Sequence, residues 1–105
     1  MPVFAVTYAY PDDSADARAA VRPAHREFLR GLADEGVLLA SGPHAEGEPA
    51  GALLLFRSPA KDELLTRLAE DPFQVEGLVS AVVATEWDVV TGSLAAQFLA
   101  AAGRG

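Results

Sequence analysis

Few side chains in this sequence are suited to acid–base, nucleophilic or metal chemistry. The chain has no cysteine and two histidines, His25 and His44, so thiol nucleophiles, thiolate metal sites and disulfides are excluded. The histidines have neither HxH nor HxxxH spacing, and we therefore predict no metal site. Ser41, in the stretch ASGP, lacks the GxSxG pattern that surrounds many nucleophilic serines. General acid–base chemistry by a histidine is the better hypothesis.

His25 belongs to the stretch AHREFLRGLADEG, residues 24–36, which predicts an amphipathic helix. On a helix that advances about 100° per residue, Leu29 and Leu32 fall within about 40° of His25. Phe28 falls within about 60°, so the histidine lies in the middle of the apolar stripe. Two interpretations stay open: a core histidine with both nitrogens hydrogen-bonded, or a base that reaches a pocket.

Strand patterns surround this helix. Residues 3–10 alternate, and they place Phe4, Val6, Tyr8 and Tyr10 on one strand face. We expect Pro23 in the first turn of the helix and Gly36 just after its end. Residues 37–43 and 52–57 predict an antiparallel hairpin.

The second half of the sequence predicts two further helices and a long strand. Ser58 and Pro59 are suited to begin a helix that the stretch EDPF, residues 70–73, would end. Residues 78–90 predict the longest strand. A terminal helix is expected after it, with Ser93 as its N-cap.

The predicted order, β-α-β-β-α-β with a C-terminal helix, is the ferredoxin-like arrangement, an α+β fold with a four-stranded antiparallel sheet and two helices on one face. We predict this domain over residues 1–92 and a C-terminal helical extension over residues 93–105. Several strands are apolar on both faces. We expect a second copy to cover the free face in a homodimer; the alternative is the C-terminal helix folded back over its own sheet.

Composition narrows the choice of partners. The net charge is −7 and the sequence contains no basic cluster, which argues against nucleic acid and against anionic membranes. No apolar stretch approaches the ~20 residues of a membrane span. No secretory signal is visible, and we expect a cytoplasmic protein.

Three stretches, RPAHREFLRGLADEGVLLASGP, EDPFQVEGLV and VVATEWDVV, follow one another in this chain. Their order and spacing resemble the YCII-related (YciI-like) family from about residue 4 to residue 90. The resemblance implies a dimeric α/β barrel of ferredoxin-like protomers and a histidine–aspartate active site without a cofactor. The family's histidine falls on His25 and its aspartate on Asp71, while its glycine–proline pair falls on Gly42 and Pro43. Some relatives act as lyases or dehydrochlorinases on small ring compounds.

The resemblance suggests what His25 and Asp71 would do together. Both predicted helices lie on the same sheet face, so the two side chains could meet. The aspartate would fix the tautomer of the imidazole, and the other nitrogen would act as a general base in an isomerisation or an elimination. We count the following residues as candidates for substrate contact: Tyr8, Ser41, Gly42, Pro43 and Phe73.

Structural alternatives accompany these roles. Asp71 could simply cap the turn after its helix, Tyr8 could pack in the core, and Gly42 with Pro43 could form a turn. The sequence thus supports a cofactor-independent lyase, dehydrochlorinase or isomerase acting on a small molecule. The alternative is a non-catalytic homodimer that binds a small ligand or serves as an accessory protein.

Overall fold

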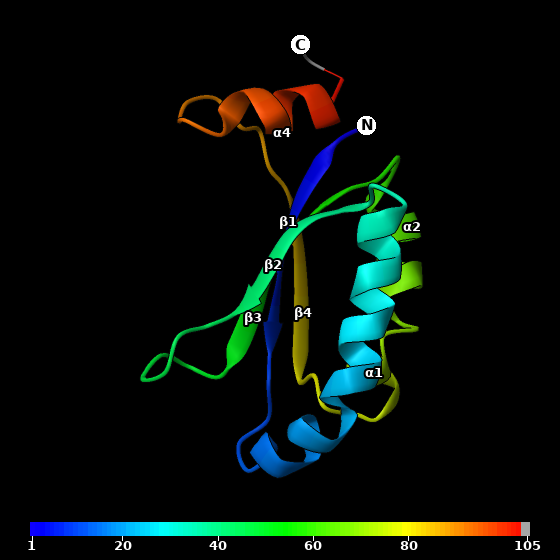
Figure 1. The fold of residues 1–105 in the computed structure, drawn as a ribbon, viewed down its shortest axis with the longest axis vertical. Helices are drawn as coiled ribbons and strands as arrows, with labels where there is room; N and C mark the ends of the chain where they lie inside the picture. The colour runs from blue at the N-terminus through cyan, green and yellow to red at the C-terminus, as the bar shows by residue number, and fades with distance from the viewer. Residues whose placement is uncertain (104–105) are drawn as a thin grey trace.

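The computed structural model describes residues 1–103, which form one sheet with helices between and after its strands in the chain (Figure 1). The elements are β1 (Val3–Ala9), α1 (Ala15–Asp34), β2 (Leu38–Pro43), β3 (Gly51–Arg57), α2 (Lys61–Leu68), α3 (Pro72–Val75), β4 (Ala81–Glu86) and α4 (Ala95–Ala101). The sheet order is β2-β3-β1-β4, and every neighbouring pair is antiparallel. The predicted ferredoxin-like α+β fold with a C-terminal helix is confirmed.

The core lies between one face of the sheet and the helices α1, α2 and α3 (Figure 1). Alternation along β1 turns Phe4, Val6 and Tyr8 toward the helices, and all three are buried. Leu32 of α1 and Leu68 of α2 meet them from the other side. Each such side chain contributes roughly 1.5–3 kcal/mol on burial, so this layer holds the two helices in place.

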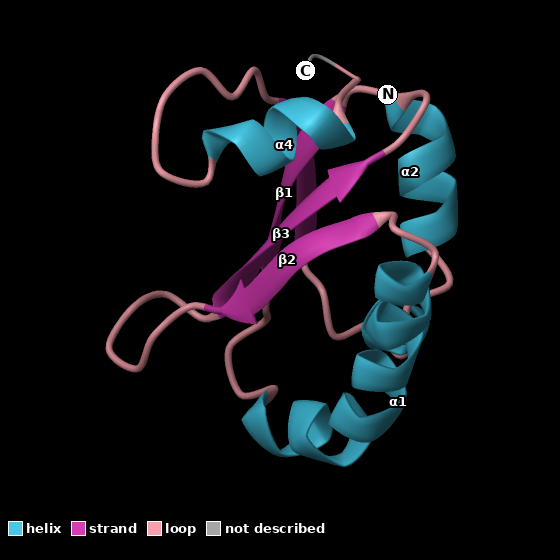
Figure 2. Cartoon of the chain, turned by 45° about the horizontal axis from the view of Figure 1, so that its top comes forward, coloured by secondary structure: helices cyan, strands magenta, loops and turns pink. Residues whose placement is uncertain are grey.

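Helix α1 is longer than the sequence predicts. We expected Pro23 in its first turn, and this is wrong, because the helix begins at Ala15 and contains Pro23 in its interior. Proline has no N–H to donate to Ala19 and its ring disturbs the preceding turn. The helix bends toward its N-terminal end, as Figure 2 shows. Its other end follows the prediction: Gly36 has a φ of 75° just beyond the helix.

Two helices begin later than predicted. Helix α2 begins at Lys61, so Ser58 is not its N-cap. The Ser58 hydroxyl donates instead to the carbonyl oxygen of Ala60 at 2.9 Å, since a serine can bond to nearby backbone in a turn as well as at a cap. Helix α4 begins at Ala95 with no side-chain cap, so the prediction for Ser93 is also wrong.

The strand predicted over residues 78–90 is reduced to β4. Leu78 belongs to the turn after α3, where its N–H donates to the carbonyl oxygen of Phe73 at 2.8 Å. Trp87 follows the strand, and its ring meets the Phe98 ring of α4 edge-on with 5.7 Å between centroids. Leu78 and Trp87 are therefore apolar because they pack in a turn and against α4, not because the strand extends to them.

The sheet face opposite the helices is open at its centre. Leu53 is 43% exposed and Val83 is 56% exposed, and both pair with Thr7 of β1 in the sheet register. Helix α4 crosses one end of the sheet, near the N-terminus (Figure 1). The alternative that this helix covers the free face therefore holds only at one end, where α4 and the residue before it line a hollow with Leu39 and Ala40 of β2. The division at residue 92 stays a prediction, and residues 104 and 105 of the predicted extension lie outside the described residues.

We predict that this open face joins two copies of the chain, because it exposes large apolar side chains in the middle of a sheet. Light scattering at micromolar concentration should give about twice the mass of one chain. Val83→Lys should yield a monomer, because pairing would bury an unpaired charge. Val75→Lys is the matched control, since Val75 is also exposed, at 66%, but lies on α3. A wild-type monomer, or an unchanged dimer in Val83→Lys, would contradict this prediction.

Candidate active site

Asp71 is held at the start of the short helix α3. Pro72 occupies the first turn, and Oδ1 of Asp71 accepts a hydrogen bond from the N–H of Phe73 at 3.0 Å. The side chain is fully buried. The alternative that Asp71 caps a turn is therefore confirmed as one of its contacts. Because cap and proline fix its backbone, the carboxylate has a defined direction toward α1.

The same carboxylate binds His25. Nδ1 of the histidine lies 2.8 Å from Oδ1 and 3.0 Å from Oδ2 of Asp71. An ionised carboxylate can only accept hydrogen bonds, so Nδ1 carries the hydrogen. In the neutral ring Nε2 is then the unprotonated nitrogen. Asp71 therefore both caps α3 and binds the imidazole of His25, two roles that the sequence offered as alternatives.

Tyr8, on β1 of the sheet, is a further hydrogen-bond donor to Asp71. Its hydroxyl donates to Oδ2 at 3.0 Å, and Gln74 Nε2 donates to the same hydroxyl at 3.1 Å. Burial raises the pKa of Tyr8 above its usual 10.0, the hydrogen bond from Gln74 opposes this, and the charge of Asp71 adds to it. Tyr8 therefore lies behind the carboxylate as a neutral donor.

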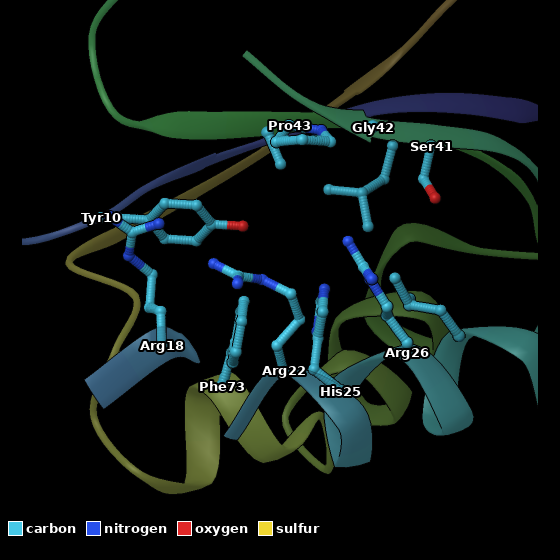
Figure 3. A pocket seen from close by; sticks show the side chains of 12 residues that line it. Tyr10, Arg18, Arg22, His25, Arg26, Ser41, Gly42, Pro43 and Phe73 are labelled. Atoms are coloured by element: carbon cyan, nitrogen blue, oxygen red, sulfur yellow. The ribbon is translucent and has the colours of Figure 1, made fainter. Parts of the chain in front are cut away.

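The ring of His25 faces a cavity of about 350 Å³ between α1 and β2 (Figure 3). The Phe73 ring stacks on the imidazole with 3.8 Å between centroids and an interplanar angle of 2°. Within residues 1–103, the hydrogen bonds of the His25 ring are those of Nδ1 to Asp71. Nε2 is consequently the nitrogen left for a ligand.

Strand β2 forms the opposite wall of the cavity because it contains a bulge. The bulge lies between Leu38 and Ala40, and it shifts the alternation of side chains by one residue. Beyond it, Ser41 and Pro43 pair with buried residues of β3 and line the cavity together with Gly42. An unbroken alternation starting from the inward-facing Leu38 would have turned Ser41 and Pro43 to the outer face.

Three arginines of α1 also line the cavity: Arg18, Arg22 and Arg26. The sequence does not indicate Arg18 or Arg22, because it predicts a helix start near Pro23. Nor does it indicate Arg26, which falls about 100° from His25 and outside the apolar stripe. On a helical wheel extended to Ala15, Arg18 falls about 20° and Arg22 about 60° from His25. A helical wheel that begins at Ala15 would therefore have indicated Arg18 and Arg22 as neighbours of His25.

Tyr10, also missed, forms the end wall. The Arg18 guanidinium lies 4.4 Å from the centroid of its ring, a cation–π distance. Burial raises the pKa of Tyr10, while the charges of Arg18 and Arg22 oppose this rise. The Tyr10 ring meets the Phe73 ring edge-on with 5.7 Å between centroids. The cavity therefore has aromatic surfaces beside cationic groups.

The structure brings most of the predicted site residues together. His25, Ser41, Gly42, Pro43 and Phe73 line the cavity, and Asp71 lies directly behind His25. Tyr8 is not among the described residues of the cavity wall, because its hydroxyl is used on Asp71. The roles of these residues toward a substrate stay predictions.

Metal-ligand clusters and membrane-spanning helices are both absent from residues 1–103. No group of three or more histidine, aspartate or glutamate side chains in this part of the chain is arranged to hold a metal ion. None of its helices has the length and apolar character needed to cross a bilayer.

The sheet order and the helices on one face define a ferredoxin-like α+β fold, which solved structures of other proteins share. The chain belongs to the family of the YCII-related domain, whose sequence profile matches residues 1–88. No curated protein sequence matches the chain.

Solved structures with this fold include enzymes. The 5-chloro-2-hydroxyhydroquinone dehydrochlorinase of Burkholderia phenoliruptrix, in complex with 2,5-dihydroxybenzoquinone, is 22% identical over 84% of this chain and 95% of its own, with a TM-score of 0.73. A muconolactone isomerase is 20% identical over 88% of this chain and 94% of its own, with a TM-score of 0.63. An antibiotic biosynthesis monooxygenase is 16% identical over 87% of this chain and 100% of its own, with a TM-score of 0.54. At these identities the likeness establishes the fold.

The contact between Asp71 and Nδ1 predicts the tautomer of His25. In wild type, ¹⁵N NMR of the neutral ring should show a protonated Nδ1. Asp71→Asn should move the proton toward Nε2, because the amide nitrogen can donate to Nδ1 where the carboxylate could only accept. His44, in the β2–β3 hairpin, is the internal reference and should not change. A folded Asp71→Asn protein that retains the Nδ1–H tautomer would contradict the prediction.

The raised pKa of Tyr8 predicts a loss of stability in alkali. Above pH 10.0 an unfolded chain loses the phenol proton that the folded chain retains, so the free energy of unfolding falls as the pH rises through this range. Tyr8→Phe should be less stable than wild type at about pH 8, by ~1–3 kcal/mol, because Asp71 loses a donor.

Between about pH 8 and about pH 11, however, Tyr8→Phe should lose less stability in urea titrations than wild type does. Lys61→Arg controls for the single lysine, which titrates in the same range. Equal losses in wild type and Tyr8→Phe would show that Tyr8 does not cause the effect.

Proposed function

We propose that this protein is a cofactor-independent enzyme that removes a proton from carbon in a small ring compound, with His25 as the general base. The observation that carries the proposal is the buried pair of His25 and Asp71, which leaves Nε2 directed to the cavity. A base in this position needs a neutral nitrogen, a fixed orientation and access to a ligand. The contacts with Asp71 support the fixed orientation, and the cavity beside the ring supports access to a ligand.

The proposed step balances without an external reagent. Nε2 of His25 takes a proton from a carbon next to a carbonyl or on an activated ring, and the electron pair of that C–H bond passes into the adjacent π system. In an isomerisation the imidazolium returns the proton to a different carbon. In an elimination the electron pair expels a leaving group as an anion. Asp71 stabilises the imidazolium because its carboxylate is already hydrogen-bonded to Nδ1.

The comparisons support this class of chemistry. The name of the dehydrochlorinase specifies loss of chloride from a chlorinated ring, and that of the muconolactone isomerase specifies rearrangement of a lactone. The first name fits an elimination and the second fits an isomerisation, the two outcomes that follow proton removal. The monooxygenase shows that the same fold hosts other reactions, so the proposal depends on His25 and Asp71 rather than on the fold.

A second candidate function is the binding of a small ligand without chemistry, in the same cavity and in a homodimer. The three arginines and the rings of Tyr10 and Phe73 in the cavity wall favour it, because these groups bind ligands whether or not His25 acts as a base. The measurement that separates the candidates is proton exchange between ligand and solvent.

The enzyme proposal predicts proton exchange that depends on His25. Muconolactone and 5-chloro-2-hydroxyhydroquinone, incubated in D₂O with the protein, should exchange a carbon-bound proton or form product, followed by NMR and ultraviolet absorbance. His25→Gln should lower the rate by ~10²–10⁴-fold. Asp71→Asn should lower it too, and the double variant should be no slower than His25→Gln, because the two residues act as one unit.

His44→Gln is the matched control, since it removes the other histidine of the chain. Circular dichroism should show that each variant is folded. A folded His25→Gln protein with the wild-type rate would refute the enzyme proposal. Binding of either compound without exchange or product in wild type would favour the second candidate.

A further inference from the structure

The cavity is cationic although the protein is acidic. The chain carries a net charge of −7 with 8 lysine and arginine residues, and three of these line the one cavity that His25 faces. No aspartate or glutamate belongs to the described cavity wall. Since a cleft lined by charges of one sign concentrates ligands of the opposite sign, this wall favours an anionic ligand.

The arginines of the cavity differ in their protein contacts from those elsewhere. Arg30 pairs with Glu27 at 2.7 Å and Arg67 pairs with Glu35 at 2.8 Å. Within residues 1–103, neither Arg22 nor Arg26 has an ion pair or a hydrogen bond from its guanidinium to the protein. Their donors are therefore available to a ligand.

Arg18 has a different role from Arg22 and Arg26. Its Nε donates to the hydroxyl of Ser14 at 3.0 Å, and its guanidinium lies over the Tyr10 ring. These contacts fix it at the end of the cavity. Arg22 and Arg26 are four residues apart on α1, where neighbouring like charges repel each other. An anion between them would remove that cost.

The two free arginines flank the proposed base. In the view of Figure 3 the His25 ring points into the cavity between the side chains of Arg22 and Arg26. The stacked ring of Phe73 gives the same region a flat apolar surface. A ligand that complements this wall has a planar ring that packs against Phe73 and an anionic group that binds the guanidinium groups of Arg22 and Arg26. It also has an acidic C–H close to Nε2 of His25.

We infer that Arg22 and Arg26 form an anion subsite, so that the substrate is a planar ring compound bearing a carboxylate or an acidic enol. This inference rests on the proposed function for the placement of the reacting carbon at His25. A carboxylate and an ionised enol of this kind share one chemistry, a delocalised anion with oxygens that a guanidinium binds in a fork. The same cations would stabilise negative charge that spreads into the ring when His25 removes the proton.

Binding of a matched pair of probes tests the subsite independently of catalysis. The probes are 2,5-dihydroxybenzoate and its neutral methyl ester, which have the same ring, measured by isothermal titration calorimetry. Wild type should bind the acid ~10-fold more tightly than the ester or better, and added salt should weaken binding of the acid alone. Arg22→Gln and Arg26→Gln should each weaken acid binding by ~10-fold and leave ester binding unchanged.

The control variant is Arg30→Gln, which removes an arginine of the same helix that is not part of the cavity wall. It should bind both probes as wild type does. Equal affinity of wild type for acid and ester, or an unchanged preference in the Arg22→Gln/Arg26→Gln double variant, would overturn the subsite. Displacement of the acid by equimolar inorganic phosphate would overturn the assignment to a planar carboxylate or enol.

The variant His25→Gln separates failure of the subsite from failure of the proposed function. It should retain the preference for the acid, because the subsite consists of arginines. If wild type shows this preference but catalyses no proton exchange, the subsite stands and the enzyme proposal fails. If exchange occurs without the preference, the enzyme proposal stands and the subsite fails.

Discussion

The buried carboxylate of Asp71 is the constraint on which the arrangement of this protein depends. An ionised group with no access to water must have its oxygens satisfied by protein donors, because an unpaired buried charge costs several kcal/mol. Its donors come from three different elements: the imidazole of His25 on α1, the hydroxyl of Tyr8 on β1 and the N–H of Phe73 on α3. The carboxylate thereby fixes these elements relative to one another, at the place where the sheet and the helices enclose the cavity.

This arrangement gives the two nitrogens of one imidazole separate tasks. Nδ1 is committed to the interior, and Nε2 is directed to the cavity, between arginines that have no carboxylate partner in the described chain. The cavity therefore combines an imidazole nitrogen, a buried carboxylate behind the ring and guanidinium groups beside it. These are the components that proton removal from an anionic ring compound would use.

The edge strand β2 and the bent helix α1 determine the shape of this cavity. The bulge in β2 turns Ser41 and Pro43 inward, and the continuation of α1 through Pro23 brings Arg18 and Arg22 to the same wall as His25. Both features are departures from regular structure, and both lie where a ligand would bind. The opposite face of the sheet is regular and apolar, as a surface for a second copy would be.

The sequence alone determined the order of the strands and of the longer helices, though not the short helix α3, because period-two and helical apolar patterns are local properties of the chain. It also placed His25 on the buried stripe and, through the family resemblance, paired it with Asp71. Only the tertiary structure showed that Asp71 caps α3 and binds His25 at once, that Tyr8 acts from behind it, and that three arginines line the cavity. The physical reason is that a proline inside a helix and a bulge inside a strand are tolerated only when the surrounding packing compensates for them. That packing is formed by residues distant in sequence, so the direction of Arg18, Arg22 and Ser41 was decided by the fold.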